Sequence, residues 1–334
     1  MFRKTAIAII LSTLVTAAAS ADDLVVTSAS VSPTSVLPAA SVWTSIEVRN
    51  ASDHPVALPT KYIIELTPPA GEPFLAWHTT SFVGWLPEAY ELQPALAPGE
   101  SRVIEFLNGA GVLAGGIFYD RRLWQPGTWG LRVILSNELR SDRLERVHWS
   151  KLMGSGFVTA PLLVTPMIRL TIEEPTGIDA EAWKALLALP SVGTLTGDRP
   201  KAGELGKQFW DKYRESRYAP YFGMAAARYI LQTGGEDRFK VVDEIHQRVI
   251  TLDRDVIFAD DLRFSSAFRK AYDAGVSHDL ATALQKTSDA RDALETVTKL
   301  AKHELTRARA RSEFRKLKSP EELKAFFATS TTDH

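Results

Sequence analysis

The chain contains no cysteine, and this absence removes several classes of chemistry at once. Disulfide bonds, thiolate catalysis, iron–sulfur clusters and cysteine-ligated zinc all require that side chain. The seven histidines are also scattered: no two lie within five residues of each other, and neither an HxH nor an HExxH spacing occurs. The sequence therefore gives no support for a metal centre or a cofactor, and we expect none.

Long apolar runs and a strong net charge are missing as well. Beyond the N-terminal segment, no stretch of 18 apolar residues occurs, so we expect no membrane-spanning helix after removal of that segment. Without Arg3 and Lys4, 37 of the 39 basic side chains remain against 40 acidic ones, a net charge of −3. Nucleic-acid binding depends on neutralising phosphates, and this near-neutral balance argues against such a partner.

What the first residues do contain is a pattern typical of export. Arg3 and Lys4 precede an almost wholly apolar run, and small residues follow at Ala19 and Ala21. The run is shorter than the roughly 20 residues that a permanent membrane helix needs. We therefore expect residues 1–21 to be a cleaved signal peptide of the general secretory route and the mature protein to act in the periplasm or outside the cell. The alternative is an N-terminal anchor. Without cysteine, a lipoprotein is excluded.

From residue 22 to residue 172 the pattern is that of short strands. "SVWTSIEVRN" alternates apolar and polar positions, and "APGESRVIEFL" and "QPGTWGLRVILSN" each begin with a Pro-Gly turn. "PMIRLTIEEP" closes the region as a last strand, Met167 to Ile172. These short strands predict an antiparallel sandwich. The succession of "VRNASDHPVALP", "LAPGESRVIEFL" and "QPGTWGLRVIL" resembles bacterial immunoglobulin-like domains, and the resemblance implies an adhesive or structural module.

After an expected linker at 173–182, the apolar spacing becomes helical, and residues 183–330 predict an all-α domain with about six or seven helices. Asp179 is the expected N-cap of the first helix. Phe239, Phe268 and Tyr272 fall on apolar stripes, a long charged helix is expected from about His278 to Lys318, and "SPEE" predicts a capping box at its end. The fold class is therefore multidomain, mainly β in the N-terminal half and all-α in the C-terminal half.

One helical stretch, "YRESRYAPYFGMAAARYIL", is unusually rich in aromatic residues. Tyr213, Ser216, Tyr218 and Ala219 give it a resemblance to tetratricopeptide-type helix pairs, although Arg214 replaces the usual proline and no second copy follows. The resemblance implies a concave peptide-binding face, with Tyr213, Tyr218 and Tyr221 as candidate binding residues. The spacing of Tyr213, Phe222 and Tyr229 beside Ala225–Ala227 favours the alternative of close helix packing.

A second candidate binding region is "AWHTTSFVGW", which we expect to be a loop of the sandwich. Aromatic side chains on such a loop stack on sugars or contact proteins, or else cover one end of the core. The candidate residues are Trp77, His78, Phe82 and Trp85. A long rigid loop "AWHTTSFVGWLPEAY" would also suit a protease inhibitor.

Patterns that suggest catalysis have simpler interpretations. "MGSGF" around Ser155 lacks the GxSxG elbow, and the glycine-rich segment 109–116 lacks a Lys-Ser/Thr ending. The carboxylate pairs Glu173-Glu174 and Asp260-Asp261 suit a linker and a helix start. The basic segment from Lys299 to Lys318 suits a solvated helix face, with anionic lipid or an acidic partner as the alternative.

Taken together, the sequence favours an exported, non-enzymatic recognition or scaffolding protein that binds protein or envelope polymer. The alternative is a hydrolase acting on envelope material, with a site at the domain junction. An enzyme requires a histidine near carboxylates or a hydroxyl, whereas a binding module requires an exposed recognition surface.

Overall fold

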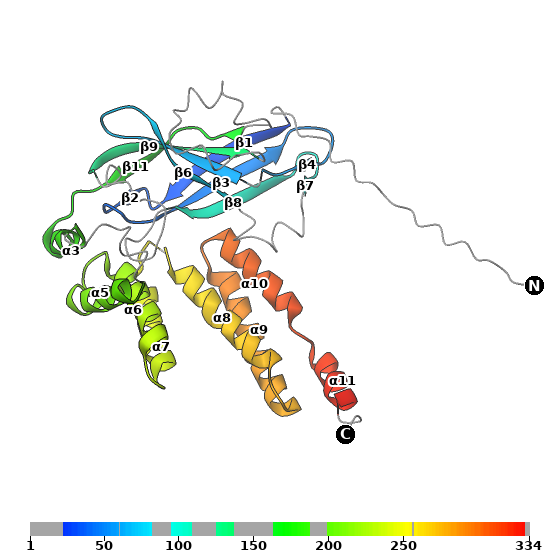
Figure 1. The fold of residues 1–334 in the computed structure, drawn as a ribbon. Coiled ribbons are helices and arrows are strands. Elements are labelled where there is room, and N and C mark those ends of the chain that lie inside the picture. The colour runs from blue at the N-terminus through cyan, green and yellow to red at the C-terminus, as the bar shows by residue number, and fades with distance from the viewer. Residues whose placement is uncertain are drawn as a thin grey trace, which may run out of the picture.

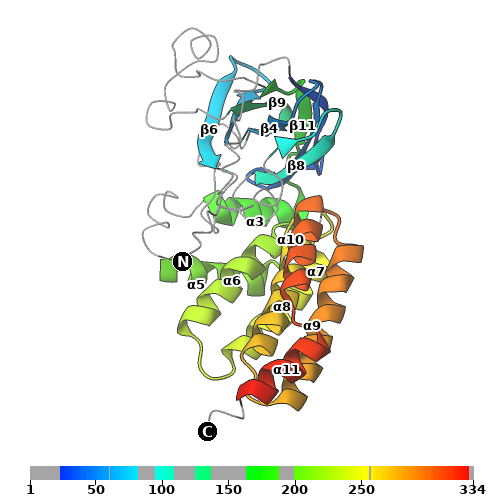
Figure 2. The same ribbon diagram turned by 90° about the vertical axis from the view of Figure 1, so that its right-hand side faces the viewer.

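The N-terminal half of the protein is built from strands and the C-terminal half from helices (Figure 1). The computed structural model describes residues 23–59, 61–81, 95–108, 125–136, 163–187, 199–255 and 257–330. The predicted signal peptide at 1–21 lies outside them. Both views place the helices on one side of the β region, with α11 furthest from it (Figures 1 and 2).

The strands form two main sheets. The first has the order β1-β3-β8, with Leu24–Ser32, Val42–Asn50 and Ser101–Asn108. The second has the order β2-β11-β9-β5-β6, with Ser35–Val36, Ile168–Ile172, Gly127–Ser136, Lys61–Thr67 and Phe74–Ser81. Two short additions are β10 (Leu163–Val164), which pairs with β9, and the pair β4 (Val56–Ala57) with β7 (Ala95–Leu96).

This strand order is that of an immunoglobulin-like sandwich. The central strand of one sheet, β3, lies between β1 and β8, and in the other sheet β9 lies between β5 and β11, as strands B and F do in that fold. The pairs are antiparallel except for β2 on β11, which is parallel. The predicted mainly β half is therefore confirmed.

Alternation along the strands supplies the core between the sheets. On β3, Ile46 and Val48 are fully buried, and Ile104 lies opposite Ile46 on β8. Trp129 and Leu131 on β9 fill the space from the other sheet. The turn before β8 is the Pro-Gly turn that the sequence predicts, and Gly99 adopts a φ of +75° there, a conformation that favours glycine.

Eight helices follow within the described residues: α3 Gly177–Leu187, α5 Arg199–Lys212, α6 Ala219–Thr233, α7 Arg238–Leu252, α8 Ala259–Gly275, α9 Leu280–Leu300, α10 Glu304–Lys316 and α11 Pro320–Ser330. The all-α prediction for this half is confirmed. At α11, Ser319 and Glu322 exchange the two hydrogen bonds of the predicted capping box.

The prediction of one long helix from His278 to Lys318 is wrong. The helix breaks between Leu300 and Glu304, where Ala301 is extended. The cause is Asp260 of α8, whose buried carboxylate accepts hydrogen bonds from the backbone N–H groups of Lys302 (2.6 Å) and His303 (3.0 Å). These bonds stabilise a new helix start at α10.

The helices bury two separate cores. The first joins α3, α5, α6 and α7 with Leu262 of α8, and the second joins α8, α9 and α10. In the first, Tyr213 and Phe222 are buried together with Ala225–Ala227, while Tyr229 is half-buried. The predicted packing of this aromatic stretch between helices is confirmed for the buried residues.

Three aromatic residues that the sequence places on apolar stripes are largely exposed. Phe239 on α7 is 53% exposed, and Phe268 and Tyr272 on α8 are 44% and 63% exposed. The reason is that α8 joins the core of α7 near its own start, through Leu262, and the two helices then diverge away from the sandwich (Figure 1). A helix stripe needs a second layer to cover it, and here that layer is absent from the described residues.

Carboxylates on α10 and on the neighbouring α8 neutralise the basic segment on α10. Arg307 and Arg311 both pair with Glu304, and Arg309 pairs with Asp261 on α8 at 2.8 Å. These pairs support a solvated, internally neutralised face. Among the described residues, no helix is both long and apolar enough to cross a membrane.

The β and α halves meet through specific contacts. Ile257 and Leu305 from the helices join the core of the sandwich, and Leu37 from the sandwich joins the first helical core. His303 stacks on Trp43 with ring centroids 4.1 Å apart, and the Leu305 N–H donates to Glu105 at 2.9 Å. The two halves are thus packed together at two places.

Candidate functional site

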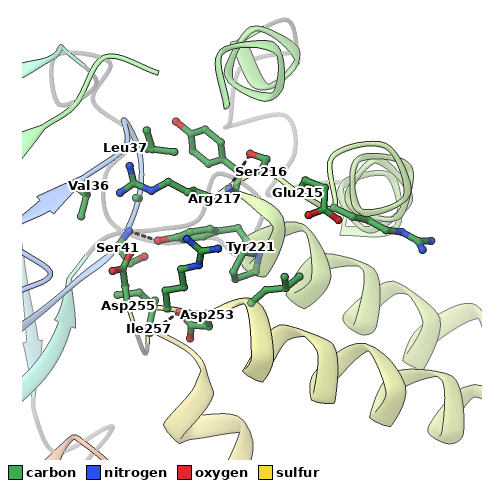
Figure 3. Close-up of a pocket in the computed structure, with 16 residues that line it drawn as sticks. Val36, Leu37, Ser41, Glu215, Ser216, Arg217, Tyr221, Asp253, Asp255 and Ile257 are labelled. Carbon is green, nitrogen blue, oxygen red and sulfur yellow. Dashed lines mark hydrogen bonds between the residues drawn. The ribbon is translucent and has the colours of Figure 1, made fainter. Parts of the chain in front are cut away.

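A cavity of about 200 Å³ opens where the sandwich meets the first helical cluster. Three segments line it: the end of β2 and the residues after it up to Ser41, residues 214–221 from the α5–α6 turn into α6, and residues 252–255 with Ile257 between α7 and α8 (Figure 3). We call it the junction cavity. Its described lining combines apolar side chains such as Val36 and Ile257 with arginine, carboxylate and tyrosine side chains.

Asp179 holds the 214–221 turn in place. Its Oδ1 accepts hydrogen bonds from the Ser216 hydroxyl and from the Arg217 backbone N–H, both at 2.8 Å. The prediction of Asp179 as the N-cap of its own helix is therefore wrong: α3 begins at Gly177, and the carboxylate turns to a distant segment instead. The turn then ends with the Tyr218 hydroxyl donating to the carbonyl of Pro38 at 2.9 Å.

Asp253 shapes the 252–257 turn in the same way. Its carboxylate accepts backbone hydrogen bonds from Ile257 (3.0 Å), Phe258 (2.5 Å) and Ala259 (2.8 Å). These are the free N–H groups at the start of α8. Burial raises the pKa of the Asp253 carboxyl, and the three N–H donors oppose that rise in part.

Tyr221 lies in the middle of the junction cavity. Its hydroxyl oxygen accepts a hydrogen bond from the Ser41 N–H at 2.6 Å (Figure 3). Its ring meets that of Phe258 edge-on. Burial raises the pKa of Tyr221, so the hydroxyl keeps its proton at neutral pH. The Ser41 side chain also hydrogen-bonds to this hydroxyl, so Ser41 holds the Tyr221 hydroxyl through both its backbone and its side chain.

Arg217 and Glu173 connect the two halves at the rim. The Glu173 carboxylate accepts from the Ser35 hydroxyl on β2 and pairs with the Arg217 guanidinium, each at 2.5 Å. The Ser35 hydrogen bond and then the Arg217 contacts lower the pKa of Glu173. The predicted carboxylate pair Glu173-Glu174 is thus structural at Glu173.

Two further charged residues of the cavity, Arg254 and Asp255, have no ion-pair partner in the described part of the chain. Arg254 is exposed and Asp255 is half-exposed. Figure 3 shows Asp255 beside Ser41 and facing Tyr221. The cavity therefore presents one positive and one negative group without ion-pair partners among the described residues, beside the Tyr221 hydroxyl.

Of the residues predicted to bind, Tyr218 and Tyr221 line the junction cavity, whereas Tyr213 is buried in the first helical core. Trp77 and His78 lie on strand β6 and not on a loop, because residues 74–81 pair with β5. Phe82 and Trp85 lie outside the described residues, as do Ser155 and the glycine-rich segment 109–116.

The binding residues predicted from the sequence do not include Ser41, Arg254 and Asp255 of the cavity lining. The sequence does contain a signal for the last two. Asp253-Arg254-Asp255 is a run of three charged residues between two helices, and so short a turn does not itself require three charges. Ser41 carried no signal. Elsewhere in the described part of the chain, no group of three or more metal-ligating side chains converges.

The histidine and carboxylate that come together at the junction are His303 and Glu105. The His303 Nδ1 lies 3.9 Å from the Glu105 Oε1, and both side chains are largely buried. They lie at the contact between the second helical cluster and β8, beneath the Trp43 ring, and so do not line the junction cavity.

No family model and no curated protein matches this chain. Solved structures similar to its N-terminal β region include β-glucosidases from Erythrobacter marinus and Listeria innocua. Each is 14% identical over 45% of this chain. The match spans 15% of the Erythrobacter marinus enzyme with a TM-score of 0.25, and 16% of the Listeria innocua enzyme with a TM-score of 0.23. The CARDB domain of a Pyrococcus furiosus protein is 11% identical over 45% of this chain and 94% of that domain, with a TM-score of 0.21. These values carry no conclusion about activity.

Proposed function

We propose that the protein is an exported, non-enzymatic recognition or scaffolding protein of the cell envelope that binds protein or envelope polymer, and that the junction cavity is its recognition site. Export rests on the signal-like residues 1–21. The observation that carries the proposal is the lining of the cavity: Arg254, Asp255 and the Tyr221 hydroxyl meet in one concavity without ion-pair partners for the two charges in the described residues.

Concave sites with a few convergent polar groups on apolar walls are typical of ligand binding. Here the apolar walls are Val36, Leu37 and Ile257, and both halves of the protein contribute to them. The resemblance of the 213–231 helix pair to tetratricopeptide hairpins also supports recognition, because its turn supplies one side of the cavity. Because both halves contribute to the site, the site would require that both occur in one chain.

The alternative of a hydrolase at the junction has one supporting observation, the raised pKa of Asp253. However, both oxygens of that carboxylate accept backbone hydrogen bonds. An acid that holds the start of a helix is poorly placed to exchange protons with a substrate. We therefore assign Asp253 to the support of the cavity.

The proposal is tested by blocking the junction cavity. The half-buried Ala40 lines it, so Ala40→Trp should fill it, while Ala281→Trp on the exposed start of α9 is the matched control. Purified mature protein is immobilised and exposed to an envelope extract. We expect the wild type and Ala281→Trp to retain the same protein or polymer and Ala40→Trp to lose it.

Circular dichroism and urea unfolding show whether Ala40→Trp remains folded. If it does not, Arg254→Glu replaces it, because that side chain is exposed and its loss breaks no ion pair in the described structure. Equal retention by the wild type and a folded blocked variant would contradict the proposal.

A further inference from the structure

We propose that the junction cavity binds a small dipolar group, a carboxylate together with an ammonium, as carried by an amino acid or a short peptide with free ends. This inference rests on the proposed function and names the ligand chemistry of the same site. It follows from two charges of opposite sign in the lining of the cavity, Arg254 and Asp255, for which the described part of the chain offers no ion-pair partner.

Arg254 is the donor in the cavity lining that can bind the carboxylate of such a ligand. The Arg254 guanidinium offers charged N–H groups, and planar guanidinium groups bind carboxylates through two parallel hydrogen bonds. The Tyr221 hydroxyl lies in the same cavity but is hydrogen-bonded to both the backbone N–H and the side chain of Ser41. Arg217 lies on the same side of the cavity but is already paired with Glu173.

The ammonium requires an acceptor. Of the carboxylates in the lining, Glu215 pairs with Arg248 at 3.9 Å and is 79% exposed, so Asp255 is the better placed acceptor. Asp253 is committed to three backbone N–H groups, and no hydrogen bond of the Asp255 side chain is found among the described residues. A ligand with only one charge would leave Arg254 or Asp255 uncompensated. The presence of both signs therefore selects a dipolar ligand over an anion or a cation.

The dimensions of the cavity limit the ligand to one or two residues. Pockets for drug-sized ligands have volumes of about 300–1,000 Å³, and the junction cavity measures about 200 Å³. Its apolar walls, Val36, Leu37 and Ile257, suit a small aliphatic side chain such as a methyl group. Alanine and dialanine have both the charges and the size.

Titration calorimetry with defined probes tests the inference on the full mature protein. The probes are L-alanine, dialanine, N-acetylalanine and alanine amide. We expect L-alanine or dialanine to bind, and the difference between these two shows whether a free amino acid or a peptide end is preferred. Removing either charge by capping should weaken binding at least about tenfold, the loss of one charge-assisted hydrogen bond.

Variants assign each charge to its partner. Arg254→Gln should weaken the uncapped probe about tenfold, and Asp255→Asn should do the same and also make L-alanine and N-acetylalanine bind equally. Arg315→Gln on α10 and Asp292→Asn on α9 are exposed matched controls and should bind as the wild type does.

No binding of any uncapped probe, or binding that neither capping nor the two cavity variants change, would overturn the inference. If these probes fail while Ala40→Trp still abolishes retention from the envelope extract, the ligand class is wrong and the proposed function stands. If Ala40→Trp leaves that retention unchanged, the proposed function itself fails.

Discussion

Three aspartates in this protein accept hydrogen bonds from backbone N–H groups at the start of a helix or in the turn before one. Asp260 on α8 holds Lys302 and His303 at the start of α10, and Asp179 on α3 holds the turn before α6. Asp253 does the same for the start of α8. Each carboxylate therefore fixes how two elements meet.

Replacing Asp253 by asparagine should destabilise the protein. The amide keeps one oxygen acceptor but turns an NH₂ group toward backbone N–H donors, so at least one buried donor loses its partner, at a cost of about 1–3 kcal/mol. Urea unfolding of Asp253→Asn should show this loss in the free energy of unfolding.

The matched control for that experiment is Asp255→Asn in the same turn. Its side chain makes no hydrogen bond among the described residues, so the expected change lies within about 0.5 kcal/mol. Equal effects of the two substitutions would contradict the supporting role of Asp253.

At this scale the sequence predicts only part of the outcome. It places Asp260 near a helix start, which is correct because α8 begins at Ala259. It does not predict that the same carboxylate starts a second helix more than 40 residues later, since that depends on how α8 and α10 pack. Asp179 fails as a predicted N-cap for the same reason.

Among the elements, α5 and α6 pack with almost no space between them. A Cβ on Gly206 of α5 would lie 2.4 Å from the Cβ of Ala225 and 3.3 Å from the backbone of α6. The small residues that the sequence identified on α6 are therefore matched by a glycine on the facing helix. This close approach lets Tyr213 and Phe222 close the edge of the interface.

Gly206→Ala should therefore destabilise the protein. Alanine gains up to about 1 kcal/mol of helix propensity over glycine, but overpacking of a tight interface costs about 1–3 kcal/mol, and here backbone atoms must move. We expect a net loss of about 1 kcal/mol in the free energy of unfolding, with the midpoint of thermal unfolding lowered accordingly.

Gly235→Ala serves as the control, because no atom lies within 4 Å of a Cβ added there. It should change the unfolding midpoint little or raise it slightly. A Gly206→Ala protein that is more stable than the wild type would show that the two helices separate easily.

Elements with a local cause were the predictable ones. Strands at 42–50, 101–108 and 127–136 follow from alternation and Pro-Gly turns, and α11 follows from its capping box. The break between α9 and α10 has a tertiary cause. So does the exposure of Phe239 and Tyr272, because periodicity identifies an apolar stripe but not the layer that covers it.

Across the whole molecule, Glu173 ties the halves together, with Ser35 on the β side and Arg217 on the helical side. Its pKa is lowered, first by the Ser35 hydrogen bond and then by Arg217. A carboxyl with a lowered folded-state pKa stabilises the fold above its unfolded pKa. That contribution disappears as the pH falls through the folded-state pKa.

Glu173→Gln should accordingly reduce the stability of the protein at neutral pH and have a diminishing effect in acid. The difference between wild type and variant should be constant above the ordinary glutamate pKa of about 4.3 and should shrink below it. Thermal unfolding monitored from pH 7 to pH 3 measures this difference.

Glu174→Gln is the neighbouring control, since Glu174 is exposed and no bond of its side chain is found in the described structure. It should show no pH-dependent difference from the wild type. A Glu173→Gln effect that persists unchanged into acid would mean that the charge of Glu173 is not what joins the halves.

The junction cavity itself could not be predicted from the sequence, although two of its tyrosines were among the candidate binding residues. Its lining comes from segments near residues 40, 217 and 254. Those segments meet only because Tyr218 and Tyr221 reach Pro38 and Ser41 in the other half of the protein. No local pattern carries that information, whereas the division into a β half and an α half does follow from local periodicity.

The connection between α7 and α8, with Asp253, Asp255 and Ile257, has a mechanical consequence. It is the covalent joint between the two helical clusters, and it is also one wall of the junction cavity. Each cluster contacts the sandwich separately. The first does so through hydrogen bonds of Tyr218 and Tyr221, and the second through the ring of His303 and the N–H of Leu305. A molecule bound against this connection would therefore set the angle between the two helical clusters. The ends of α7 and α8 farthest from the sandwich would move the most.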